Sequence, residues 1–261
     1  MSSNKKYIVI TGASSGIGME AAKLFASRGF NLILVARRFD KLNQIKSEIN
    51  SLNTDIDIIN IQCDLSIANN AYKLFEDISK YDLTALINNA GFGNFDPVTK
   101  QDLSKIQSMI HLNIESLTIL TTLFINKFSN IDNTQVINVS STGGYNIVFN
   151  AVTYCATKFF VSSFTEGLAQ ELKILNAKVK AKVLAPSATE TEFANVARDE
   201  VDFDYKKSVA KFHTAKEMAQ FLSQLFDSDK TVGYVNPLTY EFILRDSIFP
   251  FYERSQTDTP K

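Results

Sequence analysis

The stretch "YIVITGASSGIGMEAAKLFASRGFNLILVA", residues 7–36, holds two short apolar runs separated by a glycine-rich turn and a longer segment. The runs at 7–11 and 31–36 show little alternation of polar and apolar residues, which is typical of strands buried on both faces. Residues 16–28 have the period of a helix. A strand, a helix and a second strand in this order predict a right-handed unit with parallel strands.

The same alternation continues through most of the chain. Further strands are expected at 56–62, 83–88, 134–140, 177–185 and near 232–236, and further helices at 40–52, 67–79, 102–128, 154–174 and 214–228. This alternation predicts an α/β fold, a single doubly wound Rossmann-type domain over residues 1–261 with a mostly parallel sheet of six or seven strands. We expect residues 250–261 to form a flexible tail.

The composition argues against several classes of protein. With 261 residues and a formal net charge of −1, the chain has no overall field that would attract nucleic acid or an acidic membrane. Cys63 and Cys155 are not in a metal-ligand spacing, and two free thiols are favoured over one disulfide. The first residues lack the features of a signal peptide, and no apolar run reaches the roughly 18 residues that span a bilayer. The sequence therefore predicts a cytoplasmic protein without a membrane span.

The first strand leads into "TGASSGIG", residues 11–18. Glycines allow a tight turn and a close backbone approach, and a helix N-terminus offers free N–H groups to a pyrophosphate. The spacing, G-x3-G-x-G, differs from the usual G-x-G-x-x-G, and a glycine turn without a ligand is the alternative. Its place after the first strand of an alternating fold favours nucleotide binding. The candidate residues of this loop are Gly12, Ser14, Ser15, Gly16, Ile17 and Gly18.

Three further motifs follow this loop in a familiar order. They are "NNAG" at 88–91, "NVSS" at 138–141 with "YCATK" at 154–158, and "APSATETEF" at 185–193. Together with the glycine loop they resemble the short-chain dehydrogenase/reductase family over roughly residues 5–193. The resemblance implies an oxidoreductase with a bound nicotinamide dinucleotide.

The resemblance also implies where the cofactor makes its contacts. The Asp64 carboxylate would accept a hydrogen bond from the adenine amino group, although a turn-initiating aspartate is the alternative. Asn88 would bridge two strands. Ser187 stands where the family usually has glycine, which leaves the nicotinamide geometry open. The remaining expected contacts are Leu65 at the adenine, Asn89, Ala90 and Gly91 at the adenine ribose, Pro186 at the nicotinamide, and Thr189 and Thr191 at the carboxamide and a phosphate.

The end of the second strand indicates which dinucleotide is bound. An acidic residue normally binds the free ribose 2'-hydroxyl here, but this chain has Ala36 followed by Arg37 and Arg38. Two guanidinium groups would instead bind a 2'-phosphate. The sequence therefore favours NADP (NADPH), with solvated loop charges as the alternative.

Tyr154 and Lys158 lie four residues apart and so share one face of the predicted helix. A tyrosine has a pKa of about 10, and a nearby cation lowers it. The resemblance implies that Tyr154 is the acid–base group, that Lys158 tunes it and holds the nicotinamide ribose, and that Ser141 is a second donor to the substrate oxygen. Asn113 would hold a water that connects Lys158 to solvent. Ser140 should face away from this site, because side chains alternate along a strand.

These observations favour an NADP-dependent carbonyl reductase, or the reverse alcohol dehydrogenase. Phe92, Phe95, residues 147–149 and residues 192–212 should face the substrate, which favours a small to medium apolar compound. A dinucleotide-binding sensor or scaffold without turnover is one alternative, and a nucleotide-sugar epimerase is another.

Two further expectations concern mobility and assembly. Residues 190–213 lack a clean helical period and should cover the active site as a lid. The helices at 102–128 and 154–174 carry more apolar residues than one buried face needs. The first has Ile114, Leu117, Leu120, Leu123 and Phe124, and the second has Phe159, Phe160, Phe164 and Leu168. Family resemblance implies a homodimer or homotetramer through these helices, although a surplus that faces the core is the alternative.

Overall fold

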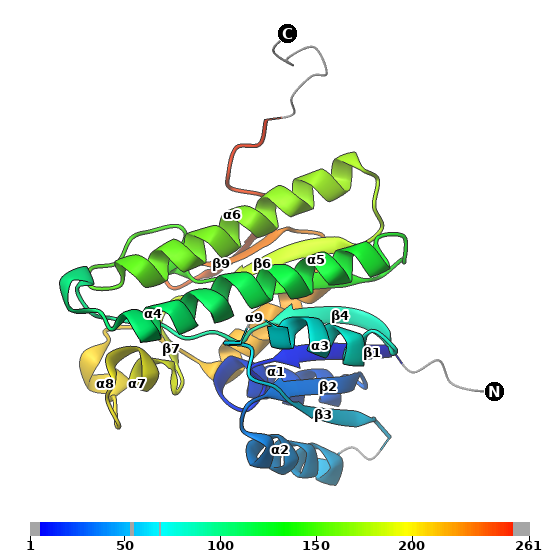
Figure 1. Ribbon diagram of the computed structural model, residues 1–261, viewed down its shortest axis with the longest axis horizontal. Helices are drawn as coiled ribbons and strands as arrows, with labels where there is room; N and C mark the ends of the chain where they lie inside the picture. Colours follow the sequence, from blue (N-terminus) through cyan, green and yellow to red (C-terminus); the bar gives the residue numbers. More distant parts are fainter. Residues whose placement is uncertain (1–5, 53–54, 68, 253–261) are drawn as a thin grey trace.

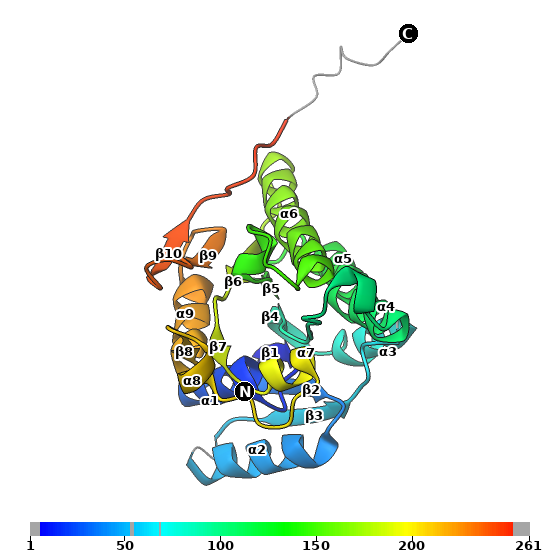
Figure 2. The ribbon, with the colours of Figure 1, turned by 90° about the vertical axis from the view of Figure 1, so that its left-hand side faces the viewer.

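The protein is described by a computed structural model at residues 6–52, 55–67 and 69–252 (Figure 1). Its centre is an eight-stranded sheet in the order β10-β9-β6-β5-β4-β1-β2-β3 (Figure 2). The strands are β1 (Lys6–Thr11), β2 (Asn31–Ala36), β3 (Ile58–Gln62), β4 (Asp82–Asn88), β5 (Gln135–Val139), β6 (Lys180–Ala185), β9 (Val232–Val235) and β10 (Phe242–Arg245).

The sheet is parallel from β3 to β9, and β10 pairs antiparallel with β9. The predicted fold class is therefore confirmed, with seven parallel strands. The eighth strand was not predicted, because "FILR" is only four residues long and half exposed. The strand order reverses beside β1, and ligands of such sheets bind at this switch point, beyond the carboxyl ends of the strands.

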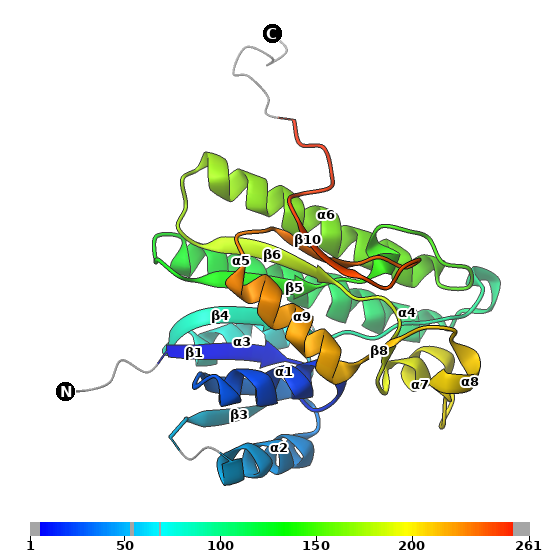
Figure 3. The same ribbon diagram turned by 180° about the vertical axis from the view of Figure 1, so that it is seen from behind.

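Helices cover both faces of the sheet (Figures 2 and 3). One face carries α1 (Gly16–Ser27), α2 (Phe39–Leu52) and α9 (Ala215–Asp227), and the other carries α3 (Asn69–Ile78), α5 (Leu117–Phe128) and α6 (Val152–Ile174). The bounds of α1, α2, α3, α6 and α9 lie within two residues of the predicted segments, because the helical period is strong in each.

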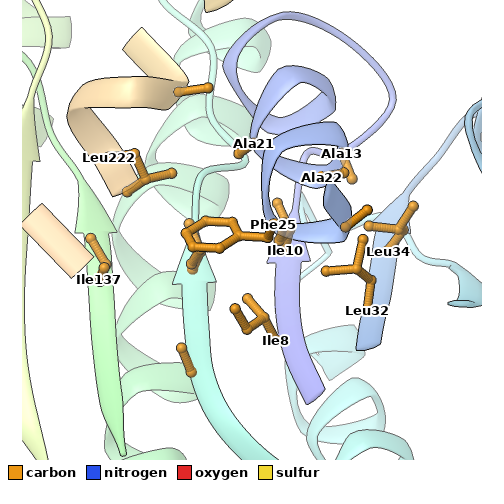
Figure 4. Close-up of a cluster of buried hydrophobic side chains, with 14 of the residues drawn as sticks. Ile8, Ile10, Ala13, Ala21, Ala22, Phe25, Leu32, Leu34, Ile137 and Leu222 are labelled. Atoms are coloured by element: carbon orange, nitrogen blue, oxygen red, sulfur yellow. The ribbon is translucent and has the colours of Figure 1, made fainter. Parts of the chain in front are cut away.

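The central strands bury side chains on both faces. Ile8 and Ile10 of β1 pack under Phe25 of α1, as Figure 4 shows, whereas Tyr7 and Val9 of the same strand pack on the opposite face. A strand with two buried faces has no polar side to alternate with, which explains the continuous apolar runs in the sequence.

The helix predicted at 102–128 has three parts. They are α4 (Leu103–Ile110), a π-helical segment (His111–Ser116) and α5. Residues Leu103–Phe128 are long and apolar enough in composition for a membrane span, although polar and charged residues such as Lys105 and Glu115 interrupt them. However, α5 packs on the sheet with Leu120 and Phe124 in the core, which is the position of a core helix.

Burial changes the expected self-association surface. Leu117, Leu120 and Phe124 of α5 are buried within the chain itself, so the core-facing alternative holds for these three residues. In α6, Phe160 is exposed and stacks on Phe164, with ring centroids 5.7 Å apart. Any apolar contact with a second copy would therefore draw on α6 more than on α5.

The region 190–213 contains short elements that its sequence did not reveal. These are α7 (Phe193–Arg198) and α8 (Tyr205–Ser208), flanked by a two-stranded parallel pair of β7 (Thr189–Glu190) and β8 (His213–Thr214). Elements of two to six residues are too short to produce a periodic pattern. In Figure 1, α7 and α8 lie beyond the ends of the strands. Of the predicted tail, residues 253–261 lie outside the described residues.

Candidate active site

The glycine loop joins β1 to α1 in a conformation that depends on its glycines. Gly12 has φ +66°, in the left-handed region. A Cβ added at Gly18 would lie 2.4 Å from the Gly12 carbonyl oxygen, so the first turn of α1 can approach the loop only without a side chain. Ser15 is the N-cap residue of α1, but its hydroxyl makes no capping hydrogen bond to the helix. The Ser15 hydroxyl oxygen instead accepts from Arg38 Nη2 at 2.9 Å.

The segment after β4 holds this loop in place. Asn89 was expected to line the adenine ribose, but its Nδ2 donates to the carbonyl oxygens of Thr11 (3.0 Å) and Gly12 (3.3 Å). The Thr11 hydroxyl oxygen accepts from the backbone N–H groups of Asn89 and Ala90, at 3.0 Å each. The Nδ2 of Asn88 donates to Asn138 Oδ1 across to β5 at 2.9 Å, as expected for a bridge between strands.

A cavity of about 550 Å³ lies at the ends of β2 and β3. Arg37 and Asp64, two of the expected cofactor contacts, are among its lining residues. The Asp64 Oδ1 atom accepts hydrogen bonds from the Ser66 backbone N–H (2.9 Å) and hydroxyl (2.7 Å). One carboxylate oxygen thus stabilises the local turn, which is the structural role considered as the alternative. Leu65 is buried, and its carbonyl oxygen accepts from Ser116.

The two arginines after β2 have different surroundings. Arg37 lines the cavity, whereas the Arg38 guanidinium turns toward the glycine loop. Its Nη2 lies 3.2 Å from Ser14 Oγ, 2.9 Å from Ser15 Oγ and 2.8 Å from Glu192 Oε2. The sequence did not single out Glu192, because nothing near it in the chain marks a partner 154 residues away.

Tyr154 and Lys158 are both buried on α6, and Lys158 Nζ is 5.9 Å from the centroid of the Tyr154 ring. Burial lowers the pKa of Lys158 to about 8. Burial also raises the pKa of Tyr154, and a hydrogen bond with Ser141 opposes that rise. The expected lowering of the Tyr154 pKa is therefore not found, because desolvation by burial outweighs the hydrogen bond with Ser141. The phenol is held in its neutral form, which can donate a proton.

Ser141 is the second residue after β5 and caps a 3-10 turn (Thr142–Gly144), where its Oγ accepts from the Gly143 N–H at 3.0 Å. A Cβ at Gly143 would be 3.4 Å from Ser141 Oγ and 3.7 Å from the Tyr154 ring, so the turn packs beside both side chains. The adjacent Ser140 hydroxyl donates to the Lys158 carbonyl oxygen instead, at 2.9 Å. The two serines therefore have separate roles, as strand alternation predicts.

Asn113 is fully buried in the π-helical segment, and such local widening of a helix often occurs at functional sites. Its Nδ2 donates to the Phe92 carbonyl oxygen (2.9 Å) and to Thr157 Oγ1 (3.1 Å), and its Oδ1 accepts from the Phe92 N–H (3.2 Å). A Cβ at Gly91 would be 3.0 Å from Asn113 Oδ1 and 3.5 Å from Lys158 Nζ. The side chains of Asn113 and Lys158 therefore both lie close to Gly91. Thr157 lies within the "YCATK" motif, but its contact with Asn113 was not predicted, because the two residues are 44 positions apart in the chain.

Aromatic rings surround the Tyr154 side chain. Its ring centroid is 5.9 Å from that of Phe95 and 5.5 Å from that of Phe193, the first residue of α7. Ile106 and Met109 belong to the same buried cluster. The nearby loop residues Ile147 and Phe149 are exposed. Apolar side chains therefore surround the polar group that would meet a substrate.

The loop after β6 lies against the glycine loop. The Pro186 carbonyl oxygen accepts from the Thr142 N–H at 2.7 Å, which ties this loop to the turn that follows Ser141. A Cβ at Gly16 would be 3.0 Å from the methyl group of Thr191. Thr189 Oγ1 donates to the Ser187 carbonyl oxygen at 2.9 Å. The expected pyrophosphate and nicotinamide loops are therefore neighbours in space.

Known proteins resemble this chain over most of its length. A family profile described as short chain dehydrogenase matches residues 6–202. Dehydrogenase/reductase SDR family member 11 of Gallus gallus is 32% identical over 71% of this chain and 75% of its own. NADP-dependent 3-hydroxy acid dehydrogenase of Schizosaccharomyces pombe is 28% identical over 95% of this chain and 88% of its own. A short-chain dehydrogenase from Sphingobium yanoikuyae, solved in complex with NADPH, is 27% identical and matches with a TM-score of 0.78, covering 87% of this chain and 86% of its own.

Proposed function

The chain belongs to the short-chain dehydrogenase family, and on this basis we propose that it transfers a hydride between NADP(H) and a carbonyl or alcohol substrate. The observation that carries the proposal is the position of Tyr154. Its phenol lies beside Ser141 and Lys158 at the carboxyl edge of the sheet, and the glycine loop is held by Asn89 at the end of neighbouring β4. A binding protein without turnover would not require a buried acid, a cation and a second donor at one point.

The described residues fit a dinucleotide. A Cβ at Gly18 would lie 2.4 Å from the Gly12 carbonyl oxygen and one at Gly91 3.0 Å from Asn113 Oδ1, so the segments of the site can pack this closely only with glycine at both positions. The uncapped hydroxyl of Ser15 and the N-terminus of α1 are suited to a pyrophosphate. NADP(H), when bound, supplies or accepts the hydride. The loop residues Gly12, Ser14, Gly16, Ile17 and Thr191 would hold its phosphates, and Ala90, Pro186 and Thr189 its ribose and nicotinamide.

The polar side chains would handle the proton. The neutral Tyr154 phenol donates to the substrate oxygen during reduction, while the Ser141 hydroxyl donates a second hydrogen bond to the same atom. Lys158 would hold the nicotinamide ribose. In the oxidation direction Tyr154 must first lose its proton, which its raised pKa opposes. Positive charge at Lys158 would favour that loss.

Arg37 supports the preference for NADP(H). It is exposed at the end of β2 and lines the cavity shared with Asp64, whereas Ala36 offers no carboxylate to a free 2'-hydroxyl. A charge-assisted hydrogen bond to a phosphate is worth roughly 1.5–3 kcal/mol, or about 10- to 100-fold in affinity. The Schizosaccharomyces pombe relative is named as NADP-dependent, which agrees with this proposal.

The test is consumption of NADPH and NADH with a panel of aldehydes and ketones. NADPH should be preferred, and Arg37→Ala should raise the Michaelis constant for NADPH about tenfold with little effect on NADH. Lys178→Ala, which removes an exposed cation that lies just before β6 and pairs with Asp132, is the matched control and should change neither. Equal use of both cofactors by the wild type would contradict the NADP preference, and no turnover on any carbonyl would favour a sensor.

The aromatic surroundings of Tyr154 support an apolar substrate. Phe95 and Phe193 contact its ring, and Ile106 and Met109 belong to the same buried cluster. We expect apolar ketones in the panel to react faster than charged ones of similar size. We also propose a homodimer or homotetramer that pairs through α6, and sedimentation that shows only monomer at micromolar concentration would refute it.

A further inference from the structure

The Glu192 carboxylate accepts hydrogen bonds from Arg38 and Ser15, beside the glycine loop. Glu192 Oε2 lies 2.8 Å from Arg38 Nη2, and the same nitrogen is within 3.2 Å of the Ser14 and Ser15 hydroxyl oxygens. The hydrogen bond from Arg38, together with one from Ser15, holds the pKa of Glu192 below its usual range. The side chain is therefore an anion held by the group that was expected to bind a 2'-phosphate.

The surroundings of this carboxylate are suited to a phosphate. The N-terminus of α1 favours negative charge, and Ser15, its N-cap residue, has a hydroxyl that is not used for capping. The Arg38 guanidinium adds a fixed positive charge. The carboxylate thus takes the place of an anionic ligand among donors that belong to the expected cofactor loop.

We propose that Glu192 is a specificity-determining residue whose carboxylate competes with the 2'-phosphate of NADP(H) for Arg38. This inference rests on the proposed function, because it assumes a dinucleotide in the glycine loop. A cofactor without the 2'-phosphate does not compete and leaves the pair intact. Arg38 and Glu192 side chains are 43% and 54% exposed, and an ion pair of that kind is weak enough for a phosphate dianion to displace.

The competition is coupled to the active site through α7. Glu192 is the N-cap residue of α7, and the next residue, Phe193, contacts the Tyr154 ring. The other end of α7 is held separately, by the Phe95 N–H donating to the Ala197 carbonyl oxygen (2.8 Å) and by Lys105 paired with Asp199 (2.7 Å). Displacement of Glu192 therefore frees only the end of α7 that lies over Tyr154.

The first measurement uses 2',5'-ADP and 5'-AMP, which differ in the 2'-phosphate and lack the nicotinamide. Calorimetry with the full chain should show that Glu192→Gln binds 2',5'-ADP about two- to fivefold more tightly, the range expected for loss of one exposed ion pair. Its affinity for 5'-AMP should stay unchanged. Glu200→Gln, which neutralises an exposed acid two residues beyond α7, should leave both affinities at the wild-type value.

The second measurement is hydrogen exchange of the α7 amides by mass spectrometry. In the wild type, 2',5'-ADP should speed exchange and 5'-AMP should not. In Glu192→Gln, exchange should already be fast and should not respond to 2',5'-ADP. A wild-type α7 that does not respond, or a variant that still responds, would overturn the coupling.

The outcomes separate this inference from the proposed function. If 2',5'-ADP binds the wild type but Glu192→Gln binds it no more tightly, the competition is refuted and the NADP(H) enzyme stands. If 5'-AMP binds and 2',5'-ADP does not, both the competition and the NADP preference are refuted. If neither binds, dinucleotide binding itself fails.

Discussion

Two buried lysines, Lys158 on α6 and Lys182 on β6, have the same shift in pKa but different hydrogen-bond partners. They are 5% and 2% exposed, and burial lowers the pKa of each to about 8. Lys182 Nζ donates to the carbonyl oxygens of Leu225 (2.9 Å), Phe226 (3.0 Å) and Ser228 (2.6 Å). Lys158 Nζ donates to the Val139 carbonyl oxygen at 2.9 Å and otherwise lies near Tyr154 and Gly91.

The difference lies in what the ammonium group binds. An ammonium has three donors, and Lys182 uses all three on carbonyl groups at the C-terminal end of α9, where positive charge is favoured. Lys158 keeps donors for a ligand. A perturbed pKa therefore does not by itself identify an active-site residue here, whereas the partners of the group and its neighbours do.

The largest effect on turnover should come from Tyr154→Phe, which changes the side chain beside Lys158. The ring still packs, but no proton reaches the substrate oxygen, so turnover should fall by about 10² to 10⁴ while cofactor binding persists. The NADPH oxidation rate with an active ketone measures this. Tyr145→Phe, which removes the hydroxyl bonded to Glu166 at 2.6 Å, is the control and should lose far less. More than about a tenth of the wild-type rate in Tyr154→Phe would refute the mechanism.

Lys158→Met should reduce both turnover and cofactor affinity and should not destabilise the fold. Removal of a buried charge with one carbonyl partner relieves a desolvation cost. Steady-state kinetics and the unfolding midpoint measured on the same preparation test both halves. If this variant were destabilised as strongly as a Lys182 variant, the distinction between the two lysines would be wrong.

Lys182→Met should show the reverse pattern. It leaves three carbonyl groups near the end of α9 without their donor, and we expect a loss of about 1–3 kcal/mol in the free energy of unfolding. Turnover per folded molecule should stay near the wild-type value. Urea unfolding gives the stability, with Lys180→Met as the control, because that lysine is exposed and pairs with Asp229 on the surface.

The smallest effect is the pH dependence of stability. The pKa of Lys182 is about 8 in the folded chain and roughly 10.4 when unfolded, so the unfolded chain binds more protons between these values. The free energy of unfolding should therefore rise with pH from about pH 8, by roughly 1.5 kcal/mol for this lysine up to pH 9.5. The free energy of unfolding of Lys182→Met, measured by urea titration at pH 8 and at pH 9.5, should increase less between these two pH values than that of the wild type. If the free energy of unfolding increased equally with pH in both proteins, the pKa of Lys182 would not be lowered in the folded chain.

Local sequence determined the repeating elements and the chemistry of the motifs. Continuous apolar runs and helical periods depend on neighbouring residues, so the seven parallel strands and the main helices could be predicted within a few residues. The Tyr154–Lys158 pair follows from one helical turn, and the glycine loop follows from backbone conformations that only glycine adopts easily. The structural role of Asn88 was also predicted correctly.

Tertiary structure alone decided which buried polar groups are paired and which remain for chemistry. Glu166 accepts from the Tyr145 hydroxyl and from the backbone N–H groups of Ile248 and Phe249, more than 80 residues away along the chain. Arg38 meets Glu192 across 154 residues, and Lys182 meets the end of α9 across more than 40. No local pattern encodes such contacts, because burial and partner depend on how distant segments pack. For that reason the sequence could name Lys158 as part of a motif but could not show that Lys182 would be equally buried with the opposite role.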